Sequence, residues 1–440
     1  MQAYSLTQWS RQIWRAGLIA GSLCACAAAA QSLPGQPALS VQAAVRAALA
    51  RSPALAVSDA AASAARNMAV AAAQRPDPVL SLSLNNLPVS GPDRFSTTAD
   101  FMTMRSASLM QTFTREDKRL ARASRFEREA DVALAERAAR SAEIGQQTAV
   151  AWLERHAQEQ RVLTLQAQRA EAGLQVQSAE AAVRSGRGST TEALAARDAV
   201  AQLQQALIVA EAELVNARQA LVRWTGGPPG QLLAAAPVLT HTRFASEPPD
   251  AALARHPELQ SLAARESAAA AEAEVARLER KPDWTGELMF SQRGAAYSNM
   301  VSVAVSVPLQ WDRPKRQDRE LAAQLARVEG LRAEQEDMLR AKRAQTQAWV
   351  QSWRAGLAQL ALIDRERLPL AGQRTELALA AYRGGQGSLA EVLAARRMAL
   401  ALQFERIDSA LAAGRLWAQL DYALPLEENT LTHSPEALAP

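Results

Sequence analysis

The chain has 440 residues, with 49 Lys and Arg against 45 Asp and Glu, so its formal net charge is only +4. This balance gives no reason to expect nucleic acid as a partner, because nucleic-acid-binding proteins concentrate basic side chains on one face. Aromatic residues make up 5% of the chain, and Ala, Glu, Arg, Leu and Gln dominate, as in long helices and coiled coils. The composition therefore predicts a helical protein with a thin core of small side chains.

Residues 1–30 are predicted to be a signal peptide for export. Arg11 and Arg15 precede an uncharged stretch that continues to Ala30. That stretch is too short for a membrane-spanning helix and suits the apolar region of a signal peptide, which ends in small residues at the cleavage site. We expect cleavage near Ala30. The alternative is a lipid-modified Cys26 as the new N-terminus, because the residues around it loosely match a lipobox.

The rest of the chain contains two copies of one sequence pattern. RSGRGSTTEALAAR at residues 184–197 is echoed by RGGQGSLAEVLAAR at residues 383–396. A repeat of about 200 residues is far longer than a solenoid unit, so it indicates a duplicated half-molecule. We predict a first repeat at 31–243 and a second at 244–440, which ends in a C-terminal tail. Shorter echoes keep the same order: Arg75-Pro76-Asp77 with Lys281-Pro282-Asp283, Lys118-Arg119 with Lys315-Arg316, and Ala151-Trp152 with Ala348-Trp349.

Each repeat contains two short segments in which apolar and polar residues alternate. In the segment 299–309 one face carries valines at every second position, and the other carries Ser302 and Ser306. This period over about ten residues is typical of a strand in an outer-membrane barrel. A half-buried strand in a soluble sheet is the alternative for any one segment. The valines are Val301, Val303, Val305 and Val307, and the other strands are predicted at about 79–87, 100–112 and 284–292.

Four strands are too few to close a barrel, because small barrels need about eight or more. An open sheet edge cannot face lipid, since its backbone groups would lack hydrogen-bond partners. We therefore expect the barrel to be shared between subunits, with the valine face of residues 299–309 against outer-membrane lipid. Beyond the signal peptide there is no second apolar run of about 20 residues, so we expect no transmembrane helix.

The longest remaining segments predict one helical hairpin in each repeat, at 115–225 and 315–420. Residues 203–224 carry a heptad seam of mostly Leu and Ala, which indicates helix-on-helix packing. A soluble coiled coil is the alternative interpretation of these segments in isolation. Each hairpin turns at a glycine pair, followed by a serine that is a predicted N-cap and a glutamate that completes a capping box. These residues are Gly186, Gly188, Ser189 and Glu192 in the first repeat, and Gly385, Gly387, Ser388 and Glu391 in the second.

The order of signal peptide, helix, β-hairpin, long helix, glycine turn and shorter helix resembles the outer-membrane factor family, the TolC-like efflux ducts. The resemblance covers about residues 38–425, and its most specific match is YRGGQGSLAEVLAAR at 382–396. It implies a fold that is mainly α with a transmembrane β-barrel. In the implied homotrimer, four strands per chain form a 12-stranded barrel in the outer membrane. A periplasmic α-helical barrel continues it.

The resemblance also implies a passive export duct and not an enzyme. Its implied partners are a periplasmic adaptor and an inner-membrane pump of the resistance-nodulation-division type. Short loops are most similar to the heavy-metal and cation efflux branch, typified by CzcC and CusC. Within the class, a multidrug efflux or type I secretion duct is the alternative. A secreted coiled-coil structural protein, from another class, would explain the heptads but not the alternating strands.

No cofactor or metal site is expected from the sequence. No pair of histidines has the spacing of metal ligands. His256 precedes Pro257 as Ser52 precedes Pro53, so we expect it at a helix boundary. The four histidines are His156, His241, His256 and His433.

By the same resemblance, Tyr382 and Arg383 lie where the family's gate residues hold the periplasmic end closed, and Arg184 is a further candidate at the tip. Glu391 matches an acidic position in the tunnel throat, and Glu192 would add negative charge. Three symmetry-related glutamates in a narrow pore would attract cations and repel anions. For both glutamates, helix capping is the alternative role. The turn glycines and serines, Gly186, Gly188, Ser189, Gly385, Gly387 and Ser388, would also contribute to adaptor docking.

Overall fold

The computed structural model describes residues 37–186 and 188–424. The chain divides into a short N-terminal unit, Met1–Pro37, and a unit Ala38–Pro440 that contains all the described helices and strands. The predicted signal peptide, with Cys26, and the tail beyond residue 424 lie outside the described residues. The described part is mainly helical with one small antiparallel sheet, so the mainly α prediction is confirmed.

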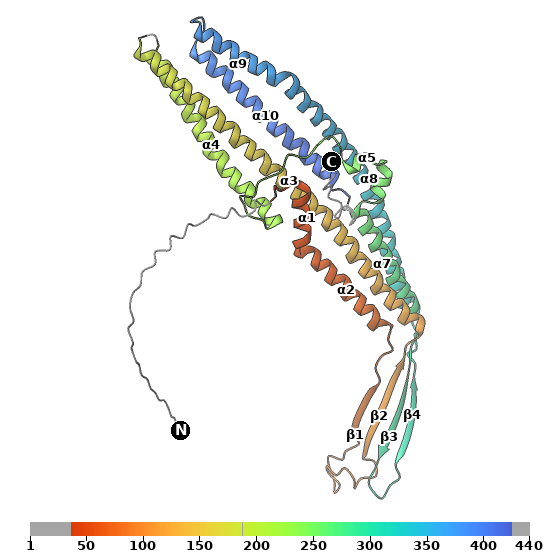
Figure 1. The fold of residues 1–440 in the computed structure, drawn as a ribbon. Coiled ribbons are helices and arrows are strands. Elements are labelled where there is room, and N and C mark those ends of the chain that lie inside the picture. Colours follow the sequence, from red (N-terminus) through yellow and green to blue (C-terminus); the bar gives the residue numbers. More distant parts are fainter. Residues whose placement is uncertain (1–36, 187, 425–440) are drawn as a thin grey trace, which may run out of the picture. The chain divides into compact units, whose positions relative to one another are not determined.

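The two repeats contain their main elements in the same order (Figure 1). The first repeat contains α1 (Val41–Arg51), α2 (Pro53–Ala73), β1 (Val79–Asn85), β2 (Met104–Phe113), α3 (Glu116–Arg184) and α4 (Thr190–Thr225). The second contains α5 (Arg243–Ser246), α6 (Pro249–Ala254), α7 (Pro257–Glu279), β3 (Trp284–Gln292), β4 (Met300–Ser306), α8 (Gln317–Leu362), α9 (Leu368–Arg383) and α10 (Leu389–Asp421). A 3-10 turn, η1 (Arg313–Lys315), precedes α8, and a π-helical turn, η2 (Ile363–Arg367), separates α8 from α9.

The four strands form one sheet in the order β1–β2–β3–β4, with every neighbouring pair antiparallel. Two of the pairs are hairpins within a repeat, whereas β2 pairs with β3 and joins the two repeats. Side chains directly opposite each other in antiparallel strands lie on the same face of the sheet. The register therefore places one row of apolar side chains on a single face across all four strands. The row runs through Leu80, Leu109, Leu288 and Val303.

The helices next to the strands continue the order of the sheet. α2, α3, α7 and α8 contact one another in that order, which is the order of β1, β2, β3 and β4. Within this unit, the strands lie at one end of the helices, and the turns between α3 and α4 and between α9 and α10 lie at the other (Figure 1). α3 has 69 residues, a length of about 100 Å at 1.5 Å per residue. None of the described helices combines the length and apolar character that crossing a membrane requires.

The main core lies where α1, the middle of α3, and the end of α10 meet. Three buried tryptophans there hold irregular connecting segments by donating an indole N–H to a backbone carbonyl, which such segments need. Trp152 donates to Leu39 O at 2.8 Å, Trp353 to Leu239 O at 3.0 Å, and Trp417 to His241 O at 2.8 Å. The sequence echo pairs Trp152 with Trp349, but the corresponding hydrogen bond is made by Trp353, one helical turn later.

The predicted heptad seam packs as helix-on-helix contacts. Its leucines Leu207 and Leu214 are buried in a cluster with Val162 and Leu165 of α3. Phe404 of α10 packs against the same cluster. The two hairpins therefore pack on each other, and the seam is shared by three helices.

The second hairpin departs from the continuous helix expected for residues 315 onward at the π-helical turn η2. Pro369 follows this turn, and a proline has no N–H and crowds the carbonyl four residues before it. A π-helical turn widens the helix at that point and accommodates the ring. Ion pairs with α10 hold both ends of the turn, Asp364 with Arg406 and Arg367 with Glu405.

Candidate functional site: the hairpin turns and the sheet

The two hairpin turns have the same backbone conformation, and glycine is required in each for two reasons. Gly186 and Gly385 have φ angles of 72° and 73°, in the left-handed region where a Cβ is unfavourable. Gly188 is required because the chain crosses close to α3: an added Cβ would lie 2.8 Å from Ala182 Cβ. Gly387 is crowded in the same way by the end of α9. The four glycines therefore fix the turns before any partner is considered.

The serines after these glycines cap the returning helices in two different ways. Ser388 Oγ accepts a hydrogen bond from Glu391 N at 3.3 Å, and Glu391 Oε2 accepts one from Ser388 N at 3.1 Å, which is a capping box. In the first repeat, Ser189 Oγ accepts instead from Thr191 N at 3.1 Å. The prediction of a second capping box, with Glu192, is therefore wrong, because the serine hydroxyl bonds one residue earlier.

The ends of the two hairpins pack against each other through a small apolar cluster. Ala179 and Ala196 of the first hairpin are buried with Leu389 and Val392 of the second, and Tyr382 packs against this cluster. Partial burial, and after it the negative charge of Glu192, raise the pKa of Tyr382 above its usual value. The structure thus brings together two candidates, Tyr382 and Glu192, that lie in different repeats.

The other charged candidates at the turns lie in solvent. Arg184, Arg383 and Glu391 are exposed. Arg184 lies 3.9 Å from Glu180, a carboxylate that Arg197 of α4 binds more closely, at 2.6 Å. The turns therefore present both signs of charge at the surface.

The sheet has one exposed apolar face and one polar face. Leu80, Leu109, Leu288 and Val303 are 68%, 51%, 54% and 74% exposed. Val301 and Val305 lie on the same face as this row, by the alternation of β4, whereas Val307 lies just beyond the end of that strand. On the opposite face, Ser106 Oγ lies 2.8 Å from Ser291 Oγ, and both side chains are buried. A continuous exposed apolar face marks a surface for membrane or another protein.

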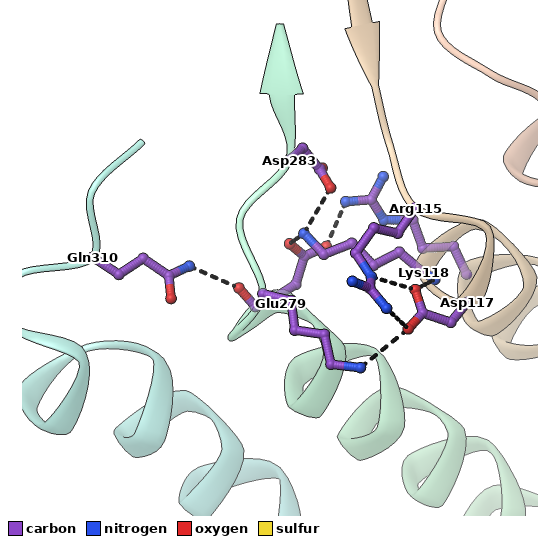
Figure 2. A network of polar contacts seen from close by, with 8 residues as sticks. Arg115, Asp117, Lys118, Glu279, Asp283 and Gln310 are labelled. Carbon is purple, nitrogen blue, oxygen red and sulfur yellow. Dashed lines mark hydrogen bonds and ion pairs between the residues drawn. The ribbon is translucent and has the colours of Figure 1, made fainter. Parts of the chain in front are cut away.

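A network of charges lies at the junction of the sheet and the helices (Figure 2). The sequence did not predict this network. Lys118 is only 3% exposed, and its Nζ lies 3.1 Å from both Glu279 Oε2 and Asp283 Oδ1. A reciprocal pair joins Asp117 and Lys281 at 3.1 Å. The signal was present as charged residues that flank the strands in the two echoes, but sequence alone does not say that the charges of one repeat meet those of the other.

The same network shifts two acids toward their charged forms. A hydrogen bond from Arg115 lowers the pKa of Asp117 well below its usual value. Burial acts to raise the pKa of Glu279, but hydrogen bonds from Arg122 and Lys118 outweigh it and hold that pKa below its usual value. Gln310 also donates to the backbone carbonyl of Glu279, at 3.1 Å (Figure 2).

Two of the described histidines, His156 and His256, occupy structural positions. His156 stacks on Trp152 with ring centroids 5.4 Å apart. His256 is the buried residue immediately before α7, as expected for a helix boundary, and burial lowers its pKa. Within the described ranges, no group of three or more His, Cys, Asp or Glu side chains is placed to hold a metal ion.

The architecture is the TolC-like fold of bacterial outer-membrane channels, and comparisons with solved structures show it. VceC, an outer membrane protein from Vibrio cholerae, matches with a TM-score of 0.69 and 20% identity, over 88% of this chain and 97% of VceC. CusC, whose folding and transmembrane channel formation were followed in crystal structures, matches with a TM-score of 0.73 and 16% identity, over 87% of this chain and 91% of CusC. The open state of the MtrE outer membrane channel from Neisseria gonorrhoeae matches with 0.70 and 14%, over 87% and 88%. No family model and no curated protein matches the sequence.

Proposed function

We propose that the chain is an outer-membrane channel of the outer-membrane factor family, a homotrimer that forms a passive export duct extending into the periplasm. The observation that carries this proposal is the sheet, with its continuous exposed apolar face and its two unpaired outer edges. In lipid, such edges are unsatisfied unless they pair, and a closed barrel removes them. Three copies would contribute twelve strands, an even number within the range of bacterial barrels.

The hairpin turns are the proposed periplasmic end of the duct. Tyr382, Arg383 and Glu391 would form the gate together with Glu192, and Arg184 would flank it. The contact between Tyr382 and the cluster shared by both hairpins supports this placement, because a closed gate needs such contacts between hairpins. The adaptor would dock at the exposed turns, and the inner-membrane pump would supply the energy.

Heavy-metal cations are the proposed cargo, and a multidrug or type I secretion duct is the second candidate. One feature supports a cation: Glu391 would place three carboxylates in one throat. The expectation of short loops holds only between β3 and β4, at residues 293–299, because the loop between β1 and β2 spans residues 86–103. A strain that lacks the chain would test the cargo. Greater sensitivity to divalent transition metals, with unchanged sensitivity to hydrophobic drugs, supports cation efflux, and the reverse supports the second candidate.

The duct itself is tested by the purified full chain. We expect a heat-modifiable trimer in the outer-membrane fraction that conducts ions in planar bilayers. A soluble periplasmic monomer without conductance would favour the coiled-coil structural protein instead. That alternative leaves the apolar face of the sheet unexplained, because a soluble protein would cover it.

A further inference from the structure

The two repeats meet inside the chain through one surface of each repeat. The equivalents of these two surfaces lie at the two outer edges of the chain, where neither has a partner within the chain. Inside the chain, β2 and α3 of the first repeat pack against β3 and α7 of the second. By the duplication, the corresponding elements are β4 and α8 at one edge, and β1 and α2 at the other. We propose that β4 and α8 of one copy pack on β1 and α2 of the next copy in the register used internally. This inference rests on the proposed trimer and assigns the residues of its seam.

The register follows from two shifts between the repeats. Asp77, in the motif before β1, corresponds to Asp283 before β3, so β1 precedes its counterpart by 206 residues. If β1 and β3 are aligned with this offset, the pairing within each hairpin makes residues of β2 equivalent to residues of β4 with an offset of 196. The corresponding pairs are Val79–Met110 in the first hairpin and Thr285–Ser306 in the second.

Applied to the internal pairing of β2 with β3, these shifts place apolar residues opposite each other at the seam. Leu109 lies opposite Leu288 within the chain, which places Val305 opposite Leu82 of the next copy. Both residues lie on the apolar face and are exposed in the single chain, at 65% and 76%. A shift by one residue would put a serine of the polar face opposite Val305. The assigned register therefore continues one apolar face around the ring.

The charges at the ends of these strands are complementary in the same register. Inside the chain, Lys118 pairs with Asp283, and the counterparts of these residues are Lys315 and Asp77. Lys315 is 81% exposed and lies 3.8 Å from Asp312. Asp77 forms no salt bridge with any residue in the ranges 37–186 and 188–424. A neighbouring copy would pair Lys315 with Asp77 as the chain pairs Lys118 with Asp283.

The reciprocal ion pair has a counterpart with one change. Asp117 binds Lys281 inside the chain, and Lys281 corresponds to Arg75. Relative to the aligned strands, which are offset by 196 residues, Lys315 lies one residue farther along the chain than Lys118, and the acid before it is Asp312. The seam therefore offers a second pair, Asp312 with Arg75 of the next copy. Because the β1 and β4 edges differ, each contact is head-to-tail, which closes into a ring.

Cross-linking tests the register directly. A chain that carries Val305→Cys and Leu82→Cys should form disulfide-linked dimers and trimers on oxidation, since directly opposed residues lie within disulfide distance. Val305→Cys with Leu80→Cys is the off-register control and should not link, because diagonal neighbours are too far apart. Each single variant controls for links through Cys24 or Cys26, the two native cysteines.

Charge reversal tests the ion pair independently. Lys315→Glu should lower trimer yield about threefold per seam, and about thirtyfold for a ring of three independent seams. Adding Asp77→Lys to the same chain should restore the yield, because every copy contributes both residues. Arg340→Glu, at an exposed position elsewhere on α8, should leave the yield unchanged.

The assigned register would be wrong if conducting trimers form normally but disulfide links appear only in the off-register variant, or in neither variant. The proposed channel would still stand in that case. Equal yields of Lys315→Glu and the double reversal would overturn the ion pair. A wild-type chain that forms no trimer would overturn the channel and the seam together.

Discussion

Lys118 Nζ lies 3.1 Å from Asp283 Oδ1, and this contact joins the start of α3 in the first repeat to the start of β3 in the second. The lysine is almost fully buried, at 3% exposure, and Glu279 supplies a second carboxylate at the same distance. A buried ammonium needs such partners, because an unpaired charge in this position would be very costly. The pair therefore locks the sheet to the helices at the place where the two repeats meet.

Removing the lysine should destabilise this junction strongly. Lys118→Met leaves Asp283 without its ion-pair partner and Glu279 with Arg122 alone, and it should cost about 3 kcal/mol. The measurement is thermal unfolding of the purified chain in detergent, followed by circular dichroism. Arg128→Met is the matched control: its ion pair with Asp131 has the same 3.1 Å distance but is exposed, so it should cost about 0.5 kcal/mol or less. Equal losses would show that burial does not set the strength of the Lys118 contact.

The junction should also weaken in acid through Glu279. Because the pKa of this acid is lowered in the folded chain, the unfolded chain takes up the proton first as the pH falls. The stabilisation is therefore complete above about pH 4.5, the ordinary value, and is lost as the pH falls through the folded pKa. Glu279→Gln should lower the melting temperature at pH 7 and flatten its fall between about pH 5 and pH 3. Glu129→Gln, in a long exposed pair, should keep the wild-type profile.

Most of the architecture could be predicted because it follows from periodicity. Alternation over residues 299–309 predicted β4, and the heptad seam predicted how α4 packs. The duplication predicted that both features occur twice. These signals are local, and the physics that sets them acts within one strand or one helix.

Contacts between the repeats could not be predicted, because no local pattern encodes them. The pairing of β2 with β3 and the ion pair of Lys118 with Asp283 depend on which elements become neighbours. The π-helical turn before Pro369 is a different case. The proline predicts a disturbance of the helix, but it does not say whether the helix kinks or forms a π-helical turn.

The turn glycines should not tolerate alanine. Gly385→Ala places a Cβ at a φ of 73° and should cost about 1–2 kcal/mol. Gly188→Ala should cost a similar amount for another reason, the contact with Ala182. Gly372→Ala, in the middle of α9 with open space around its Cα, should instead be stabilising by up to about 1 kcal/mol. Thermal unfolding separates the three variants, and a uniform effect would mean that turn geometry does not matter.

The lipid-facing assignment of the sheet is tested on two adjacent residues of β4. Val303→Arg, on the apolar face, should cost about 2–4 kcal/mol per chain if that face meets the bilayer midplane. Ser302→Arg, on the polar face of the same strand, should be better tolerated in assembly. Both variants are compared by the yield of heat-modifiable trimer in the outer-membrane fraction. Equal defects would contradict the two-faced sheet.

Two roles of Glu391, capping and gating, can be separated because glutamine preserves one of them. Glu391→Gln keeps an oxygen that accepts from Ser388 N, so α10 stays capped. Glu391→Ala removes both the charge and the cap and should cost about 1 kcal/mol of helix stability. If the charge lines the throat, both variants should lower cation over anion selectivity in planar bilayers. If the residue only caps, Glu391→Gln should match the wild type.

The gate itself is tested by removing contacts that only the closed state uses. Tyr382 packs on the apolar cluster shared by the two hairpins, and Arg383 is the exposed last residue of α9. Tyr382→Ala combined with Arg383→Ser removes the packing of the tyrosine ring on this cluster and one surface charge. It should favour the open state, because the open state does not depend on these contacts. We expect higher single-channel conductance at unchanged trimer yield. Arg184→Ser serves as the comparison in the first repeat, and a combined variant with unchanged conductance would place the gate away from the turn of α9 and α10.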